Sequence, residues 1–205
     1  MNRLSAENLH LWRGDTHVLR GVSFAVQGGE CLQVTGANGA GKTTLMRALC
    51  GLTPLEEGEV RWCGLAIGAD LAAYHQALAY VGHDNGLKAD LTAQENLRFS
   101  AGLRRRITPA AIAAALARVD LTPQQTLPLR QLSAGQRRRV ALARLTLLEA
   151  QLWILDEPGS NLDAAGHSLL LELLGAHLAT GGTAVVATHQ ALGLAAGQIK
   201  GVLLQ

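Results

Sequence analysis

The first part of the chain alternates apolar and polar residues, a pattern typical of β-strands. Between residues 4 and 26 the stretches LHL and HVLRGVSFAV alternate and end in a glycine pair, which predicts antiparallel strands joined by turns. The apolar run CLQVT, residues 31–35, predicts a further strand. The segment KTTLMRALC, residues 42–50, then has helical spacing and stops at Gly51, as a helix end should.

Beyond residue 90 the pattern becomes helical. Thr92 and Glu95 form a predicted capping box before ENLRFSAGL. Thr108, followed by Pro109, is a helix cap with proline at the first helical position, and it opens the alanine-rich AAIAAALARV. These signals predict a helical insertion at about residues 90–132.

Strands and helices alternate in the last third of the chain. A helix after Ser133 extends to about residue 150 and is followed by the strand LWILD, a helix over about 164–179, the strand TAVVAT and a final strand near 201–204. Such alternation predicts a parallel sheet. We therefore expect an α/β fold with a mainly parallel core, an N-terminal antiparallel β subdomain and an inserted α-helical subdomain, all within one domain spanning 1–205.

Composition and charge narrow the class of protein. With 205 residues, 48% apolar residues and a net charge of +2, the chain suits one globular, soluble domain without an electrostatic footprint for nucleic acid. We interpret the arginine triplets 104–106 and 137–139 as solvated helix faces. No apolar stretch is long enough to span a bilayer, so a partner is expected to bring the chain to any membrane. Cys31, Cys50 and Cys63 lack metal-binding spacing and are expected to be reduced, buried thiols.

The most informative motif is the stretch GANGAGKT, Gly36 to Thr43. It matches G-x-x-x-x-G-K-[ST] between a predicted strand and a predicted helix, which is the context of a phosphate-binding P-loop. Its glycines let backbone N–H groups turn toward phosphates at a helix N-terminus. Lys42 can reach the β and γ phosphates, and Thr43 can offer a hydroxyl to Mg²⁺.

Two further strands end in polar residues. LWILDEP ends in Asp156 and Glu157, and TAVVAT is followed by His189. Because the carboxyl ends of parallel strands line one crevice, Asp156 is expected beside the P-loop, where a metal needs an oxygen ligand. Glu157 is positioned to polarise a water molecule. His189 is either structural or a donor to a γ-phosphate.

The stretch LSAGQ, residues 132–136, predicts a capped helix start. Ser133 and Gln136 form a capping box, and Gly135 beside it leaves backbone donors open to solvent. This arrangement predicts a second anion site without a second glycine loop.

Taken in order, GANGAGKT, LSAGQRRRVALAR, LWILDEP, SNLD and ATH resemble the nucleotide-binding domain of ATP-binding cassette (ABC) transporters over nearly the whole chain. This resemblance implies a head-to-tail homodimer in which each ATP lies between the P-loop of one subunit and the LSAGQ motif of the other. It also implies that Glu157 is the general base, that His189 is a γ-phosphate switch, and that Thr43 and Asp156 hold Mg²⁺. Trp12 falls where the family places an aromatic residue that stacks on adenine, and the alternative is an ordinary strand aromatic.

The resemblance implicates a larger set of residues in ATP binding, from the P-loop, the LSAGQ motif and the loop that joins the two sites, together with the aromatic Trp12 and with His83 after YVG. They are Trp12, Gly36, Ala37, Asn38, Gly39, Ala40, Gly41, Lys42, Thr43, Thr44, His83, Ser133, Gly135, Gln136 and Asp163.

A narrower resemblance concerns YVGHDNGLKADLTAQENLRF, WILDEP and ATHQ. Together with the short chain, these look like the ATP-binding subunits of the haem exporters used in bacterial cytochrome c maturation. Most ABC proteins have glutamine after the strand YVG, whereas this chain has His83, as that group does. SNLD departs from the commoner SALD but keeps Asp163.

The resemblance implies an ATPase on the cytoplasmic face of the bacterial inner membrane that drives transmembrane subunits for haem export or for release of a haem chaperone. The alternatives are a transporter ATPase for another cargo, a soluble ABC ATPase acting on DNA or ribosomes, and a nucleotide-gated module without turnover. The 91 residues from Lys42 to Ser133 leave no room for the long coiled coil of DNA-repair relatives. Intact Glu157 and His189 argue against a module without turnover.

Overall fold

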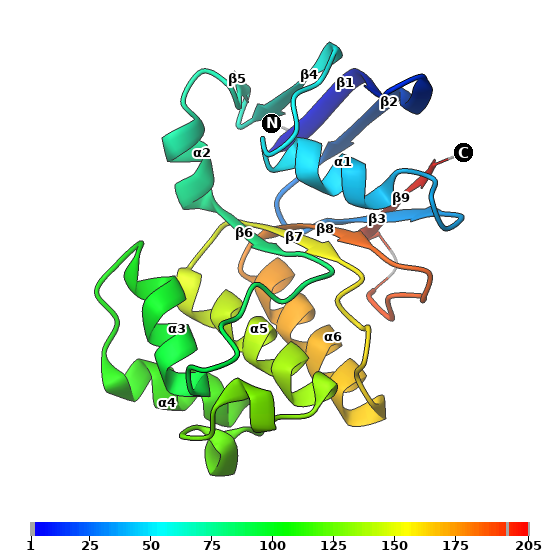
Figure 1. Ribbon diagram of the computed structural model, residues 1–205. Coiled ribbons are helices and arrows are strands. Elements are labelled where there is room, and N and C mark those ends of the chain that lie inside the picture. Colours follow the sequence, from blue (N-terminus) through cyan, green and yellow to red (C-terminus); the bar gives the residue numbers. More distant parts are fainter. Residues whose placement is uncertain (1–2, 196, 205) are drawn as a thin grey trace.

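Two β-sheets form the framework, with one helix between them and the remaining large helices on the far side of the larger sheet (Figure 1). The computed structural model describes residues 3–195 and 197–204. The smaller sheet has the strand order β2-β1-β4-β5, and the larger has the order β6-β7-β8-β3-β9. The strands of the smaller sheet are β1 (Leu4–Arg13), β2 (Thr16–Val26), β4 (Glu57–Trp62) and β5 (Leu65–Ala66).

The smaller sheet is antiparallel throughout, as the alternating pattern predicts. β1 pairs with β2 on one side and with β4 on the other, and β4 pairs with β5. The buried positions of β1, among them Leu4, Leu9 and Leu11, form the inner face of this sheet.

The larger sheet is parallel and holds the strands that end in the sequence motifs. Its members are β6 (Leu78–Val81), β7 (Leu152–Asp156), β8 (Thr183–Ala187), β3 (Cys31–Gly36) and β9 (Ile199–Leu204). β7 and β8 are buried along their whole length, because helices or the smaller sheet cover both faces. The neighbours β7, β8 and β3 end at the same edge of the sheet, which brings their three following loops together.

Most of the helices predicted from the sequence are present, and their predicted caps are formed. Both expected capping boxes form: Thr92 caps α3 with Glu95, and Ser133 caps α5 with Gln136. Thr108 caps α4, whose first residue is proline. The helices are α1 (Lys42–Leu49), α2 (Leu71–Ala77), α3 (Ala93–Gly102), α4 (Pro109–Arg118), α5 (Ala134–Leu148) and α6 (Ala164–Ala179), with 3₁₀ turns at Thr122–Gln124 and Leu129–Gln131.

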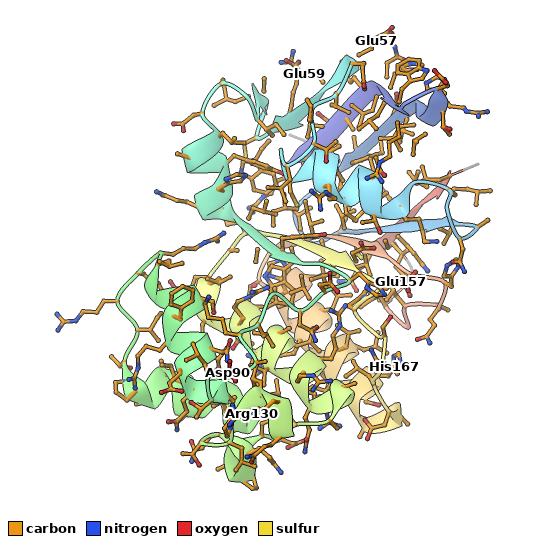
Figure 2. All side chains as sticks on the ribbon, in the orientation of Figure 1. Glu57, Glu59, Asp90, Arg130, Glu157 and His167 are labelled. Atoms are coloured by element: carbon orange, nitrogen blue, oxygen red, sulfur yellow. The ribbon has the colours of Figure 1, made fainter. Side chains whose placement is uncertain are left out.

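The larger sheet separates two hydrophobic cores. Leu152 and Ile154 of β7 pack with α1 and the smaller sheet, whereas Trp153 and Leu155 pack with α3, α4, α5 and α6. Successive side chains of a strand point to opposite faces, so one apolar strand serves both cores. Figure 2 shows Glu157 at the end of this strand. It also shows Asp90 beside Arg130, and Arg130 Nη1 donates a hydrogen bond to Asp90 Oδ1 at a distance of 2.7 Å.

Some sequence interpretations need correction. Cys31 and Cys50 are buried free thiols, but Cys63 is exposed because it lies in the turn between β4 and β5, where its φ is positive. The triplet 137–139 is not a uniformly solvated face, since Arg138 is only 2% exposed. The sequence pattern also gave no prediction of β4, β5 and α2. Within residues 3–195 and 197–204, no helix has the length and apolar character needed to cross a bilayer.

Candidate active site

The P-loop wraps around the start of α1 in a conformation that needs glycine. Gly36, Gly39 and Gly41 all have positive φ, at 149°, 85° and 95°. A Cβ atom on Gly36 would lie 2.7 Å from the Leu204 carbonyl oxygen, and one on Gly41 would lie 2.7 Å from Val18 Cγ1. Gly41 is also the N-cap of α1 and supplies no side-chain acceptor, so the first N–H groups of the helix can serve an anion.

Lys42 is buried in this loop, with 8% of its surface exposed. Its ammonium group donates to the carbonyl oxygens of Gly36 at 2.9 Å and Ala37 at 3.2 Å, and it lies 2.9 Å from His189 Nε2. These partners are neutral, so the lysine's positive charge attracts an anion. Since an ammonium group can only donate, His189 Nε2 must accept, and the ring proton belongs on Nδ1.

Asp156 and Glu157 leave β7 in different directions. Asp156 is 1% exposed, and its Oδ2 makes no hydrogen bond to any residue that the structure describes. Glu157 has φ of 47°, a left-handed conformation that costs a non-glycine residue about 1–3 kcal/mol. Its side chain remains partly open to solvent, and Oε1 lies 3.6 Å from His189 Nε2.

A cavity of about 470 Å³ joins these groups. Sequence reasoning did not identify three of its residues: Arg13 and Val18 from the hairpin of β1 and β2, and Ser160 after β7. Ser160 follows the DEP motif closely, which is a usable signal, whereas the hairpin residues come close only through tertiary packing. The lining residues are Arg13, Val18, Asn38, Gly39, Gly41, Lys42, Thr43, Thr44, His83, Asp156, Glu157, Ser160 and His189.

Trp12 lies outside the lining of this cavity. Its ring is stacked on His17, with centroids 3.8 Å apart and planes 6° apart, and His17 is in turn stacked on His10. The backbone N–H of Trp12 donates to Glu56 Oε2 at 3.3 Å. The aromatic residue is therefore held in place next to Arg13, which does line the cavity.

The LSAGQ motif forms a separate surface. Ser133 Oγ accepts from the Gln136 N–H at 3.1 Å, and Gln136 Oε1 accepts from the Ser133 N–H at 2.9 Å. A Cβ on Gly135 would lie 2.7 Å from the Asn161 carbonyl oxygen, so glycine is required there. This surface borders a cavity of about 570 Å³, lined by Asp120, Leu121, Ser133, Ala134, Gly135, Gln136, Arg139, Asn161 and Asp163.

Asp163 lines the LSAGQ cavity and lies a few residues after Asp156 and Glu157 of the P-loop cavity, so the chain connects the two surfaces there. It follows β7 by a short loop and caps α6, accepting from the Gly166 N–H at 2.8 Å and from Arg139 Nη2 at 2.9 Å. The hydrogen bond from Gly166, and then the one from Arg139, hold the pKa of Asp163 below its ordinary value. Asp163 therefore stays ionised beside Arg139, which lies on α5, the helix that begins at the LSAGQ motif.

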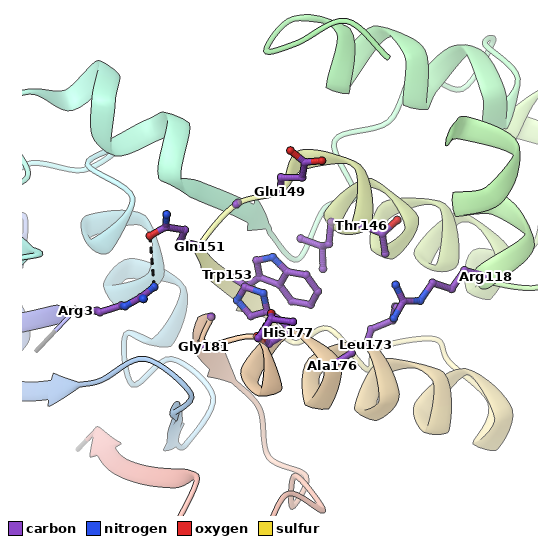
Figure 3. Close-up of a pocket in the computed structure, with 14 residues that line it drawn as sticks. Arg3, Arg118, Thr146, Glu149, Gln151, Trp153, Leu173, Ala176, His177 and Gly181 are labelled. Carbon is purple, nitrogen blue, oxygen red and sulfur yellow. Dashed lines mark hydrogen bonds between the residues drawn. The ribbon is translucent and has the colours of Figure 1, made fainter. Parts of the chain in front are cut away.

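A further cavity of about 420 Å³ lies at the opposite, amino end of β7 (Figure 3). Trp153 and His177 are stacked there with centroids 4.0 Å apart, and Arg3 Nη1 donates to Gln151 Oε1 at 3.4 Å. Burial lowers the pKa of His177. None of the predicted site residues lines this cavity, so the P-loop cavity is the candidate active site.

A P-loop beside a strand that ends in two carboxylates defines a P-loop nucleotide-binding protein. The separate LSAGQ surface carries the motif that, among these, resembles ABC proteins. The family described as ABC transporter matches residues 19–160. The chain therefore belongs to the ABC transporter family, and it is an ATP-binding ABC-type ATPase.

Relatives and solved structures agree with this assignment. The chain is 46% identical to a Yersinia pestis protein named cytochrome c biogenesis ATP-binding export protein CcmA, over 98% of this chain and 92% of the relative. A Methylococcus capsulatus protein of the same name is 50% identical over 92% of both chains. The structure of an ATP-binding subunit of an ABC transporter has a TM-score of 0.81 and 28% identity, covering 91% of this chain and 79% of the other.

A second solved structure shares the fold. It is an ATP-binding cassette dimer in a post-hydrolysis state with ADP and Pi, with a TM-score of 0.82 and 24% identity, covering 91% of this chain and 88% of the other.

Proposed function

We propose that this chain is the ATP-hydrolysing subunit of a membrane ABC complex for cytochrome c biogenesis, which exports haem or releases a haem-loaded chaperone. The observation that carries this proposal is the near full-length identity of 46–50% to relatives named as cytochrome c biogenesis export proteins. The chain would act as one domain, at the cytoplasmic face of the bacterial inner membrane, bound to transmembrane subunits.

The residues around the P-loop support hydrolysis as well as binding. Lys42 would exchange its carbonyl partners for β and γ phosphate oxygens and release His189 Nε2, which would donate to the γ-phosphate once the ring proton has moved from Nδ1 to Nε2. Glu157 would accept a proton from the attacking water, while the bond between the γ-phosphorus and the leaving ADP oxygen breaks. The loop amides of residues 37–41 would hold the other phosphate oxygens.

The donor set also suits Mg²⁺. Asp156 Oδ2 is buried without a hydrogen-bond partner among the described residues, and the Thr43 hydroxyl lines the same cavity. Mg²⁺ prefers such hard oxygen ligands, is commonly held by one or two carboxylates plus substrate phosphates, and would neutralise charge on the β and γ phosphates when bound. We propose that Thr43 holds it directly and Asp156 through water.

The LSAGQ surface supports a head-to-tail homodimer. Ser133, Gly135 and Gln136 would meet the γ-phosphate bound at the P-loop of the other subunit, and Asp163 would connect the two sites. ATP would thus join the subunits, and hydrolysis would separate them.

The test is co-purification of a tagged chain from bacterial membranes, followed by assay of cytochrome c maturation in a strain lacking the endogenous subunit. We expect membrane subunits to co-purify, and Glu157→Gln to abolish maturation at unchanged protein level. Co-purification without rescue of maturation would favour a transporter for another cargo. A tagged chain that recovers no membrane protein, but hydrolyses ATP, would favour a soluble ABC ATPase.

A further inference from the structure

Arg138 is a fully buried arginine on α5, two positions after the LSAGQ motif. It is 2% exposed, and every N–H of its guanidinium group has an acceptor. Nε donates to the Pro158 carbonyl at 3.0 Å. Nη1 donates to the Gly82 carbonyl at 2.8 Å and Asn85 Oδ1 at 2.9 Å, and Nη2 donates to the carbonyls of Asp156 at 3.0 Å and Glu157 at 2.7 Å.

Three of these acceptors are successive carbonyls, those of residues 156, 157 and 158. In an extended strand successive carbonyl groups point to opposite sides, so three successive carbonyls can accept from one guanidinium group only where the backbone makes a turn. The left-handed φ of Glu157, 47°, produces that turn. The guanidinium group therefore binds the turn that aims the Glu157 carboxylate into the ATP cavity.

The other acceptors belong to the segment that follows β6. Gly82 and Asn85 flank His83, which lines the ATP cavity together with Glu157. One side chain thus bonds to two of the segments that border the cavity, and that side chain belongs to the helix that starts at Ser133.

We propose that Arg138 is a positioning residue for ATP hydrolysis, which fixes the Glu157 turn and ties segment 82–85 to it. Arg138 is not among the residues that line the ATP cavity, and it acts through the Glu157 turn and segment 82–85. The inference rests on the proposed role of Glu157 as general base, and it does not depend on the cargo or on the membrane subunits.

No other side chain offers the same set of donors. A guanidinium group offers five donors in a planar fork, whereas lysine offers three from one atom. Burial lowers the pKa of Arg138, and the nearby Asp156 carboxylate acts in the opposite direction. The charge is retained, because arginine stays protonated in proteins and its five hydrogen bonds offset the loss of hydration.

The test uses the purified full-length chain with Mg²⁺ and ATP, comparing wild type with Arg138→Met and Arg138→Lys. Misplacing a reacting group by about 1 Å can cost on the order of 10²-fold in rate, so we expect that loss of kcat in Arg138→Met, with ATP Kd within about twofold. Arg138→Lys should fall between them. In the Glu157→Gln background Arg138→Met should have no further effect on turnover, because both changes remove the same function.

The matched control is Arg144→Met on the same helix. Arg144 is partly buried and donates from Nη2 to the Tyr80 carbonyl at 2.9 Å, but it makes no hydrogen bond to the 156–158 turn or to segment 82–85 among the described residues. It should lower the unfolding temperature and leave kcat unchanged. An equal loss of kcat in Arg144→Met, or normal kcat in either Arg138 variant, would overturn the proposal.

Asn85→Leu distinguishes the hold of Arg138 on segment 82–85 from its hold on the Glu157 turn. It removes one acceptor of Arg138 and leaves the Glu157 turn bonded, so kcat should fall less than in Arg138→Met, and the double variant should lose no more than Arg138→Met alone. If Arg138→Met does not fold, Arg138→Lys and Asn85→Leu carry the test, and unchanged kcat in either of them overturns the proposal. A wild-type chain without turnover would instead overturn the proposed function, and this inference with it.

Discussion

The chain has two surfaces suited to phosphate, and they differ in how complete they are. The P-loop surface surrounds its cavity with a buried lysine, a buried carboxylate, a second carboxylate and a histidine from adjacent strand ends. The LSAGQ surface offers a capped helix start and a glycine that admits close backbone approach. Its described lining residues include no lysine, and its carboxylate Asp163 is paired with Arg139.

This difference indicates a division of labour. The P-loop surface carries a lysine, two carboxylates and a histidine around one cavity, whereas the LSAGQ surface offers mainly donors for a phosphate held elsewhere. Because both surfaces occur in one chain and line separate cavities, a second copy in head-to-tail orientation would bring each into use.

The largest effect on turnover is expected when the P-loop surface, the more complete of the two, loses Glu157, its proposed general base. Glu157→Gln preserves shape and removes the proton acceptor, so turnover should fall by about 10²–10⁴-fold while ATP binding persists. Phosphate release and nucleotide titration measure the two quantities, and light scattering should detect a trapped dimer in ATP.

The control for that change is Glu172→Gln, an exposed residue of α6 that lines neither cavity, which should leave turnover unchanged. A monomeric Glu157→Gln chain in saturating ATP would contradict the proposed closure.

The incomplete surface is tested by Ser133→Arg. The bulky cation should block hydrolysis yet leave ATP affinity of the monomer intact, because the affected phosphate belongs to the other subunit. Ser168→Arg, the same change on the exposed face of α6, is the control and should remain active.

A mixing experiment sharpens this prediction. A Lys42→Ala subunit mixed with a Ser133→Arg subunit forms one site with both defects and one site with neither. Recovery of phosphate release on mixing two inactive chains would support action across the interface, whereas continued inactivity together with weakened monomer binding in Ser133→Arg would exclude it.

A smaller effect is expected at Trp12, which is held beside the complete surface by its stack on His17. If it packs on adenine, Trp12→Ala should weaken ATP binding by about 0.5–1.5 kcal/mol, and Trp12→Phe should retain most of the affinity. Titration with ATP and with inorganic triphosphate separates the cases, since only ATP has a base to lose. Equal weakening for both ligands would assign Trp12 a structural role.

The smallest effect is expected at His83. Imidazole is a poorer Mg²⁺ ligand than a hard oxygen, so we expect His83 to bond a water molecule at the metal or the γ-phosphate, the alternative being contact with the membrane partner through loop 84–88. His83→Gln should retain most ATPase activity, while His83→Ala should lower turnover more than ATP affinity. An unchanged rate and unchanged membrane coupling in His83→Ala would remove His83 from the site.

Sequence periodicity predicted the elements that carry a clear face or a cap. β7 and β8 are uninterrupted apolar runs, and α3, α4 and α5 begin with recognisable caps. Strand ends also predicted which polar residues would meet, because parallel strands share one edge. The segment from β4 to α2 gave no signal: β5 has two residues, and only Tyr74 of α2 is buried.

Arg138 shows what composition alone conceals. An arginine triplet favours a solvated face, yet Arg138 stands three, four and seven residues before the buried Ala141, Leu142 and Leu145, on the same stripe of α5. The helical period could have identified it as buried, but its acceptors could not be predicted, because Gly82, Asn85 and the 156–158 turn come from distant parts of the chain. Arg13 and Val18 escaped prediction for the same reason.

The resting position of Lys42 affects the entropy of nucleotide capture. A long lysine side chain normally loses up to about 1.5–2 kcal/mol of rotamer freedom when it is immobilised. Here the ammonium group is already held by Gly36, Ala37 and His189, so folding has ordered it before any phosphate arrives. Binding then exchanges one set of acceptors for another without ordering a free side chain, and more of the interaction energy remains available for affinity.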